Sequence, residues 1–366
     1  MLKKSQHLPK YYLHINYMAD KNFTPYTFDM PPIVFGTSGL GNLFVALPDE
    51  IKQEIVKECI THSNGRVIFD SAGKYGAGLA LESLGKCLNA LNVDPEDVII
   101  SNKLGWVRTE LKTPEPTFEP GVWRDLKYDA EQHISYAGII KCFEQGNELL
   151  NGYIPQMVSV HDPDEYLAKA QSADEDEKLY NDILEAYRAL ETLKRDGKVK
   201  AIGVGAKDWR SIARVYNDVN LDWVMIANSM TIKSHPGPLL NFMKKLQDDG
   251  VHIINSAVFH SGYLIGGDYF DYKLIAADEP QHKALIKWRE DFFKLCTKFN
   301  IKPAEACVQF ALMAPGVKSI ALSTTNPKRV KDNIAMGAIN VPKAFWDEMI
   351  SQELVDKNYF EYASIN

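Results

Sequence analysis

The stretch RVIFDSAGKYGAG, residues 66–78, decides how the rest of this chain is interpreted. It begins with an apolar run of strand character that ends in Asp70, and Tyr75 follows five residues later next to glycines. An apolar run without strict alternation is typical of a strand that is covered on both faces in a parallel sheet. An acid at the end of such a strand, with a phenol in the same loop, raises the question of a site there.

Seven similar runs lie along the chain, separated by longer helical patterns. The expected strands are residues 32–37, 66–70, 97–103, 156–162, 200–205, 222–228, 251–257 and 317–324, and expected helices include 49–61, 80–92, 177–196, 237–249 and 302–313. Eight such units predict a closed (β/α)8 barrel, the TIM barrel. The alternative, a doubly wound open sheet, requires Gly-x-Gly-x-x-Gly after its first strand, and GTSGLGNLF at 36–44 lacks the third glycine.

The composition excludes several classes of protein. There are 41 basic and 48 acidic residues and no basic block, so nucleic acid is not an expected partner. Five scattered cysteines without a Cys-x-x-Cys pair predict neither a disulfide framework nor a metal site, and a cytoplasmic setting is expected. No signal peptide or membrane span is predicted.

No linker divides the chain. We therefore expect an N-terminal extension at 1–30 and one barrel domain at 31–366, which includes a C-terminal helix and tail. Two connections are long, at 105–132 after the third strand and at 257–281 after the seventh. Long aromatic loops in compact domains are usually functional lids, although a surface excursion over a barrel helix is the alternative. Monomer and homodimer both remain open.

Four polar side chains are predicted to meet where the second, third and fourth strands end. They are Asp70, Tyr75, Lys103 and His161, and the carboxyl ends of barrel strands share one face. A nearby ammonium should lower the pKa of the phenol, while Asp70 orients Lys103 and His161 directs the reacting oxygen. Such a set can exchange a proton with an alcohol or carbonyl, but the hydride needs a nicotinamide.

Three motifs resemble the signature regions of the aldo-keto reductases: FDSAGKYGAG, SNKLG and SVHDPDEY. The resemblance runs from about residue 33 to 342. It implies a (β/α)8 barrel that binds NAD or NADP without a Rossmann domain, with Asp70, Tyr75, Lys103 and His161 as the catalytic tetrad. HDPDEY, IGVGAKDW and the proline-rich loop after the third strand look most like the sugar dehydrogenase branch, which includes D-threo-aldose and L-galactose dehydrogenases.

The chain departs from the family pattern at two places. Ala80 and Leu81 replace a Ser-Glu pair at the start of a helix, where little effect on chemistry is expected. Gly205 and Ala206 replace a Ser-Asn pair that holds the carboxamide of the cofactor in many members. That contact must then be made by backbone groups or by Asn228.

The stretch LSTTNPKRVKDN after the eighth strand places hydroxyl groups at a helix start, which favours phosphate, although an ordinary capped helix gives the same pattern. The resemblance adds Arg329 and Asn333 for the adenosine end, and NSAVFHSGYLIGG as the pyrophosphate loop. Ser323 stands where many NADP-preferring members have lysine, which favours NAD. The expected cofactor-binding residues are Gly36, Thr37, Asn228, Ser256, Ala257, Phe259, Gly262, Leu264, Ser323, Thr324, Thr325, Arg329 and Asn333.

The leading hypothesis is an NAD(P)-dependent enzyme that oxidises the anomeric carbon of a free aldose, of the L-fucose, D-arabinose or L-galactose type, to a lactone. Tyr75 is the expected general base, and Trp106 is expected to face the sugar beside Tyr75 and His161. One alternative is a reductase of aldehydes or ketones with the same tetrad. Another is a non-catalytic, cofactor-binding redox sensor, and a third is a glycosidase using Asp70 and Asp162.

Overall fold

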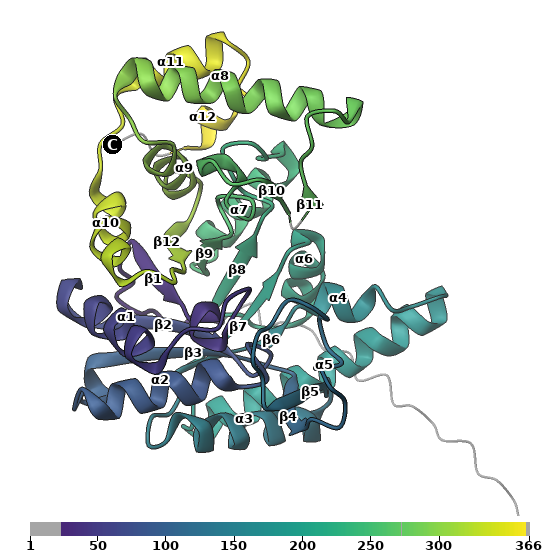
Figure 1. Cartoon of the computed structure of the whole chain (residues 1–366). Helices are drawn as coiled ribbons and strands as arrows, with labels where there is room; N and C mark the ends of the chain where they lie inside the picture. Colours follow the sequence, from purple (N-terminus) through teal and green to yellow (C-terminus); the bar gives the residue numbers. More distant parts are fainter. Residues whose placement is uncertain (1–22, 272, 364–366) are drawn as a thin grey trace, which may run out of the picture.

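Eight parallel strands close into a barrel in the computed structural model, which describes residues 23–271 and 273–363 (Figure 1). Neighbours in the barrel follow the order of the chain, and the first strand pairs with the last. Residues 1–22 of the expected N-terminal extension and the last three of the tail lie outside the described residues. The barrel strands are β1 (Ile33–Gly36), β2 (Val67–Ala72), β3 (Val98–Leu104), β6 (Met157–His161), β7 (Ala201–Ala206), β8 (Trp223–Ala227), β9 (His252–Ser256) and β12 (Val317–Leu322).

A helix follows every barrel strand and covers the outside of the barrel, as the alternating pattern predicts (Figure 1). The predicted (β/α)8 fold is thus confirmed, and the open-sheet alternative is wrong because β1 and β12 are hydrogen-bonded. These helices are α1 (Asp49–His62), α2 (Leu79–Ala90), α3 (Tyr136–Leu150), α5 (Ala173–Arg195), α6 (Trp209–Asp218), α7 (Gly237–Asp248), α9 (Pro303–Leu312) and α10 (Val330–Ala335).

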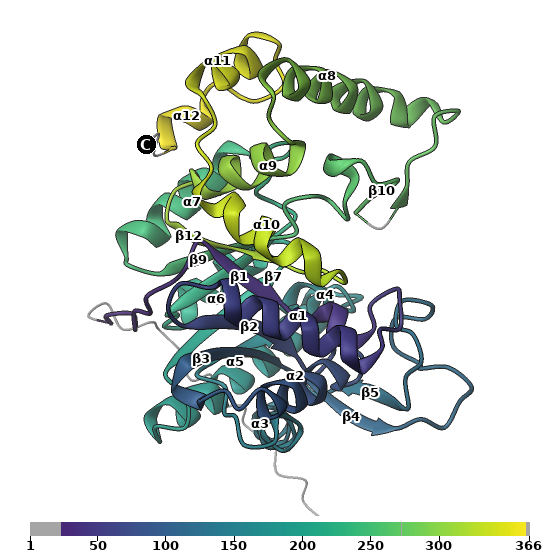
Figure 2. The same ribbon diagram turned by 60° about the vertical axis from the view of Figure 1, so that its left-hand side comes forward.

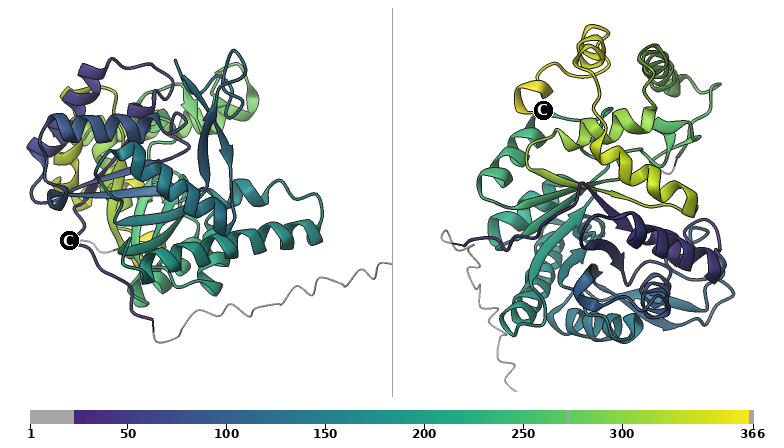
Figure 3. Two further views of the ribbon diagram at one scale, coloured as in Figure 1. Left: turned by 90° about the horizontal axis from the view of Figure 1, so that it is seen from below. Right: turned by 90° about the vertical axis from the view of Figure 1, so that its left-hand side faces the viewer.

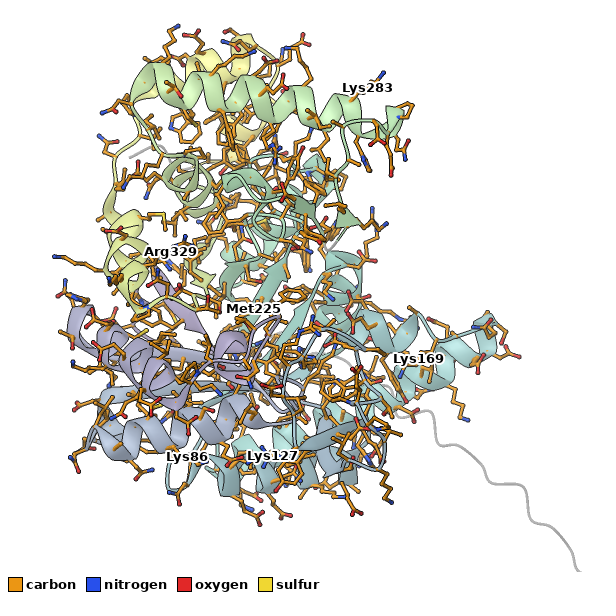
Figure 4. The ribbon with its side chains drawn as sticks, viewed as in Figure 1. Lys86, Lys127, Lys169, Met225, Lys283 and Arg329 are labelled. Carbon is orange, nitrogen blue, oxygen red and sulfur yellow. The ribbon has the colours of Figure 1, made fainter. Side chains whose placement is uncertain are left out.

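Apolar side chains fill the lower part of the barrel. Alternate residues of each strand face inward, and the inward set includes Ile68, Trp223 and Met225. Figure 4 labels Met225 among the barrel strands. Phe28 and Met30, which precede β1, pack against this set. Side chains therefore fill the barrel at the amino ends of its strands, and a site can form only at the carboxyl ends.

Gly203 of β7 makes room for the indole of Trp223 on the next strand. A Cβ atom at Gly203 would lie 2.2 Å from the ring, and Trp223 is buried. We predict that Gly203→Ala lowers the free energy of unfolding by about 3 kcal/mol, because overpacking a rigid core is costly. Denaturant unfolding measures this. The matched control is Gly237→Ala at the start of α7, where nothing lies within 4 Å, and it should leave stability unchanged or slightly raised.

Two insertions leave the barrel from its carboxyl face. The long segment after β3 is not an irregular loop throughout, since β4 (Trp106–Glu110) and β5 (Tyr128–Gln132) pair as an antiparallel ribbon. Figures 2 and 3 show this ribbon projecting beside the barrel. The segment after β9 carries a smaller pair, β10 (Tyr269–Phe270) and β11 (Lys273–Leu274). The short helix α4 (Pro163–Leu167) follows β6.

Three further helices form a layer outside α9: α8 (Lys283–Phe299), α11 (Lys343–Ser351) and α12 (Tyr359–Tyr362) (Figures 1 and 2). Phe299 of α8 meets Phe345 of α11 edge to face. All five cysteines are buried and unpaired. Within residues 23–271 and 273–363, every helix is too short or too polar to traverse a bilayer, and His, Cys, Asp and Glu side chains form no metal-binding group.

Candidate active site

Strand register brings Asp70, Lys103 and His161 to one level of the barrel. Ala72 pairs with Lys103 across β2 and β3, and Lys103 pairs with Ser159, two residues before His161, across β3 and β6. All three polar side chains are buried. The chain turns sharply after β2, where the Tyr75 N–H donates to the Ala72 carbonyl at 3.1 Å, and this turn brings the phenol to the same place.

Lys103 is bonded to two members of the set. Its Nζ forms a buried ion pair with Asp70 and lies 3.1 Å from the Tyr75 hydroxyl oxygen. Ser101, two residues earlier on the same face of β3, donates to the other Asp70 oxygen at 3.0 Å. Asp70 is thus engaged on both oxygens, which leaves it unsuited to the glycosidase role considered as an alternative.

The electrostatics of Tyr75 differ from the expectation. Close packing around the hydroxyl raises the pKa of Tyr75, although the Lys103 ammonium works in the opposite direction as expected. Burial disfavours phenolate more than one ammonium favours it, because Asp70 offsets much of the charge of Lys103. Burial alone would lower the pKa of Lys103, but Asp70 and Tyr75 raise it above its ordinary value, so the amine stays charged.

His161 is neutral at physiological pH. Burial, and then the cations Lys103 and Lys74, hold the pKa of His161 well below its usual range. Its ring meets the Tyr75 ring edge to face at 5.6 Å. Its Nδ1 is buried without a partner among the described residues, while Nε2 lies 3.6 Å from Asp162 Oδ2. The single ring proton is therefore best placed on Nε2, where it faces negative charge.

Lys74 is a buried cation at this site that sequence reasoning missed. Its Nζ lies 2.7 Å from Glu119, 2.9 Å from Glu165 and 3.7 Å from Asp162, and its side chain is 4% exposed. Burial would lower the pKa of Lys74, but these three carboxylates raise it. Its position beside Tyr75 was the one available signal in the sequence, since all three of its partners come from the segments after β3 and β6.

An aromatic wall from the segment after β3 stands beside Tyr75. Trp123 lies 5.9 Å from the Tyr75 ring, and Phe118 packs against both Trp106 and Trp123. The Trp123 N–H donates to Glu119 at 2.7 Å, which ties this wall to Lys74. Trp106, expected to face a sugar, belongs to the same cluster, and its buried N–H has no acceptor among the described residues.

The predicted cofactor residues after β1 and β12 lie together. Gly36, Thr37, Thr324 and Asn333 line one small cavity. The Thr37 hydroxyl is already engaged, because it donates to the Asp70 carbonyl at 3.1 Å and bonds Ser71 at 2.8 Å. Thr37 therefore supports the tetrad rather than offering a free group.

Some of the residues expected near the adenosine end already use their side chains in contacts within the protein, and others do not. Ser323 contacts Ser38 at 3.3 Å, and Thr325 packs near Gly39. Thr324 closes a local turn by accepting from the Asn326 N–H. Arg329 is exposed, and its guanidinium has no partner among the described residues (Figure 4).

The segment after β9 has a strained backbone that suits close approach of a ligand. Ala257, His260 and Ser261 have φ values of 55°, 45° and 55°, which non-glycine residues rarely adopt. Gly262 has φ 91° and no atom within 4 Å of the position of a Cβ. The remaining expected residues of this segment lie differently: Ser256 bonds the Ile226 carbonyl, Phe259 is partly buried, and Leu264 is fully buried.

A buried hydrogen-bonded relay holds this segment, and the sequence did not reveal it. His260 Nε2 lies 2.8 Å from the Thr231 hydroxyl, and Nδ1 lies 2.9 Å from Asp271. Thr231 accepts from the backbone N–H groups of Lys233 and Ser234, so its hydroxyl donates to the imidazole. The relay ties the connections after β8 and β9 to each other and preserves the strained conformation.

The residues present fit a nicotinamide dinucleotide. Gly205 pairs with His161, and a Cβ atom at Gly205 would lie 4.0 Å from Lys103 Cδ, so the glycine leaves that side of the lysine uncovered. Asn228, at the end of β8 with φ 60°, has a side-chain amide without a hydrogen bond among the described residues. The free Arg329 guanidinium and the open side of Gly262 suit anionic groups. Ala80 and Leu81 lie in the first turn of α2, as expected, and both are buried.

A family model matches residues 32–352, and its description is the aldo/keto reductase family. The chain belongs to the aldo/keto reductase family. Three curated relatives have low identity but near full coverage. Pyridoxal 4-dehydrogenase of Microbacterium luteolum is 25% identical over 87% of this chain and 93% of its own length. D-threo-aldose 1-dehydrogenase of Pseudomonas is 23% identical (89% and 95%), and L-galactose dehydrogenase of Arabidopsis thaliana is 21% identical (82% and 82%).

Solved aldo-keto reductases share the fold of this family member. The holo form of an enzyme from Bacillus halodurans superposes with a TM-score of 0.65 at 16% identity, over 91% of this chain and 96% of that one. An enzyme from Klebsiella pneumoniae in complex with NADP and acetate gives a TM-score of 0.58 at 16% identity, over 90% and 93%. The resemblance to the two sugar dehydrogenases is confirmed, whereas these comparisons give no support to the expected preference for NAD.

Proposed function

We propose that this aldo/keto reductase oxidises the anomeric carbon of a free aldose to the lactone with NAD or NADP. The observation that carries the proposal is the Tyr75 hydroxyl, held 3.1 Å from a charged Lys103 at the barrel mouth beside a neutral His161. Two of the curated relatives are named as sugar dehydrogenases. Their low identity leaves the individual sugar to experiment.

Each member of the tetrad has a role that follows from its contacts. Tyr75 exchanges the proton of the anomeric hydroxyl, since its oxygen is the titrating group that Lys103 stabilises as phenolate. Asp70 keeps Lys103 charged and pointed at Tyr75. His161, with its proton on Nε2, donates a hydrogen bond to the same substrate oxygen and fixes its direction.

The nicotinamide, when bound, would accept the hydride that leaves the anomeric carbon, while the proton of the anomeric hydroxyl goes to Tyr75. Asn228 and the space at Gly205 are proposed to hold its carboxamide end, and Gly262, Thr324 and Arg329 its phosphates and adenosine. The wall of Trp106, Phe118 and Trp123 is proposed to keep water from Tyr75 and to face the apolar side of the sugar.

The raised pKa of Tyr75 favours a second candidate, reduction of an aldehyde or ketone. A phenol that stays protonated at neutral pH is a ready proton donor to a carbonyl oxygen, whereas oxidation uses only its deprotonated fraction. The same tetrad runs in either direction, so the physiological direction depends on substrate and cofactor. The redox-sensor alternative predicts bound nucleotide without turnover.

A spectrophotometric screen separates these candidates. L-fucose, D-arabinose, L-galactose and pyridoxal are each mixed with NAD or NADP, and small aldehydes with NADH or NADPH. The proposal expects reduced cofactor to form with at least one aldose and the lactone to be the product. Turnover of aldehydes alone would favour the reductase, and no turnover with any substrate would favour the sensor.

Cofactor choice can be tested at Arg329. We predict that Arg329→Gln weakens NADP binding by about tenfold and NAD binding by less than about twofold, because a lost contact to the 2′-phosphate affects only NADP. Quenching of tryptophan fluorescence measures both dissociation constants. Lys331→Gln, an exposed cation on α10, is the control. Equal weakening of both cofactors would mean that Arg329 stacks on adenine, and unchanged affinity for both would remove Arg329 from the cofactor site.

A further inference from the structure

Asp162 is a carboxylate at the barrel mouth with no hydrogen bond among the described residues. It follows His161 directly and has φ 46°, a strained value for aspartate. Its Oδ2 lies 3.6 Å from the Nε2 atom of the neutral His161 and 3.7 Å from the Nζ atom of the charged Lys74, and neither group donates a hydrogen bond to it. Asp162 is the N-cap residue of α4, yet its side chain does not cap that helix.

The neighbouring carboxylates of Asp164 and Glu165 accept hydrogen bonds, whereas that of Asp162 accepts none from the described residues. Asp164 accepts from the backbone N–H groups of Lys207 and Asp208, at 3.1 and 2.8 Å. Glu165 pairs with Lys74 and Lys207. Asp162 is only 15% exposed, and burial together with Glu165 raises the pKa of Asp162 to about 6. Asp162 is therefore a mostly buried carboxylate that can still accept a hydrogen bond from a ligand.

We propose that Asp162 accepts a hydrogen bond from the substrate hydroxyl on the carbon next to the reacting carbon. The inference rests on the proposed function, in which His161 Nε2 and Tyr75 bind the reacting oxygen. Vicinal oxygens are separated by one carbon–carbon bond, so one can face His161 while the other faces Asp162, whose Oδ2 is 3.6 Å from that nitrogen. Asp162 is then a specificity residue that selects 2-hydroxylated substrates.

The hydrogen bond from the substrate hydroxyl to Asp162 is expected to be strong for a chemical reason. A hydroxyl donates to carboxylate in a charge-assisted hydrogen bond, which contributes more than a bond between neutral groups. Lys74 stands on the other side of Asp162 and keeps it ionised against burial. A substrate without this hydroxyl would leave the carboxylate desolvated and without a hydrogen-bond donor, so the site would disfavour binding of that substrate.

A matched pair of pentoses tests this. D-arabinose and 2-deoxy-D-ribose differ only in the 2-hydroxyl, and kcat and KM are measured for both with wild type and Asp162→Asn. Wild type is expected to prefer D-arabinose in kcat/KM by roughly 10- to 100-fold, the range of one hydrogen bond to a charged group. In Asp162→Asn the preference should fall below about threefold, mainly through a higher KM for D-arabinose. Asparagine tolerates positive φ, so the variant should fold.

Glu165→Gln is the matched control, because it removes the same charge from Lys74 on the same short helix. It should keep the preference for D-arabinose. Asp162→Gly, which suits φ 46° and removes the group entirely, should behave as Asp162→Asn, and an unaltered rate with 2-deoxy-D-ribose shows that either variant is folded.

The outcomes separate the inference from the function on which it rests. Equal kcat/KM for the two pentoses in wild type overturns the role of Asp162 and leaves the oxidation standing. If Glu165→Gln loses the preference for D-arabinose as fully as Asp162→Asn does, the preference depends on the charge around Lys74. That result also overturns the role of Asp162. L-fucose with its 2-deoxy form and glycolaldehyde with acetaldehyde extend the panel, and no turnover of any member overturns both the function and the inference.

Discussion

Tyr75→Phe is expected to lower kcat by about 10³-fold while the dissociation constant of the cofactor changes by less than about twofold. The substitution removes one hydroxyl, the atom that Lys103 contacts at 3.1 Å, and keeps the ring that packs against Trp123 and His161. Loss of a positioned general acid or base costs about 10²–10⁴ in rate. Steady-state kinetics with the best substrate of the screen, and fluorescence titration with NADP, measure the two quantities.

The control for that experiment is Tyr128→Phe. Tyr128 lies in β5 and is exposed, and Arg108 stacks over its ring. Its hydroxyl makes no hydrogen bond among the described residues, so its removal should leave kcat unaltered. If Tyr75→Phe keeps more than about a tenth of the wild-type rate, another group moves the proton.

Lys103→Met is expected to give the largest combined loss, in stability as well as in rate. Both partners of the Lys103–Asp70 ion pair are buried, and the substitution leaves the Asp70 carboxylate without its cation. Breaking a buried pair from one side costs about 3–5 kcal/mol of unfolding free energy. The rate should fall by at least about 10²-fold, because Tyr75 loses both its orientation and the charge that stabilises phenolate.

A double-mutant cycle separates the two effects. Asp70→Asn/Lys103→Met removes both charges, so its unfolding free energy should exceed that of Lys103→Met alone by about 2 kcal/mol or more. Denaturant unfolding of the four proteins measures this coupling. The double variant should remain inactive, since it restores stability and not the ammonium. Additive losses of stability would show that Asp70 does not depend on Lys103.

The barrel and the tetrad could be predicted because their signals are local in the sequence. Continuous apolar runs mark strands buried on both sides, and the register of parallel strands carries Asp70, Lys103 and His161 to one face. Ser101 could have been added by the same reasoning, since it lies two residues before Lys103 on the same side of β3.

The features that were missed depend on contacts between distant segments. The ion pair of Lys74 with Glu119 and the tie from Glu119 to Trp123 exist only because the segment after β3 folds over the barrel mouth. Tyr75 is enclosed at the same place, and its burial raises the pKa that was expected to be lowered. Thr37 was predicted as a cofactor-binding residue, and only the structure shows that its hydroxyl donates a hydrogen bond to the Asp70 carbonyl in β2.

The most direct test of the account is the single-turnover rate of aldose oxidation as a function of pH. The account makes Tyr75 the proton acceptor and places its pKa above the ordinary value near 10, so the phenolate fraction grows about tenfold for each pH unit below that value. The oxidation rate should therefore rise steadily from pH 6 to pH 10 in wild type and be low and flat in Tyr75→Phe. A wild-type rate that is flat across this range, or a rise that survives in Tyr75→Phe, would contradict the account.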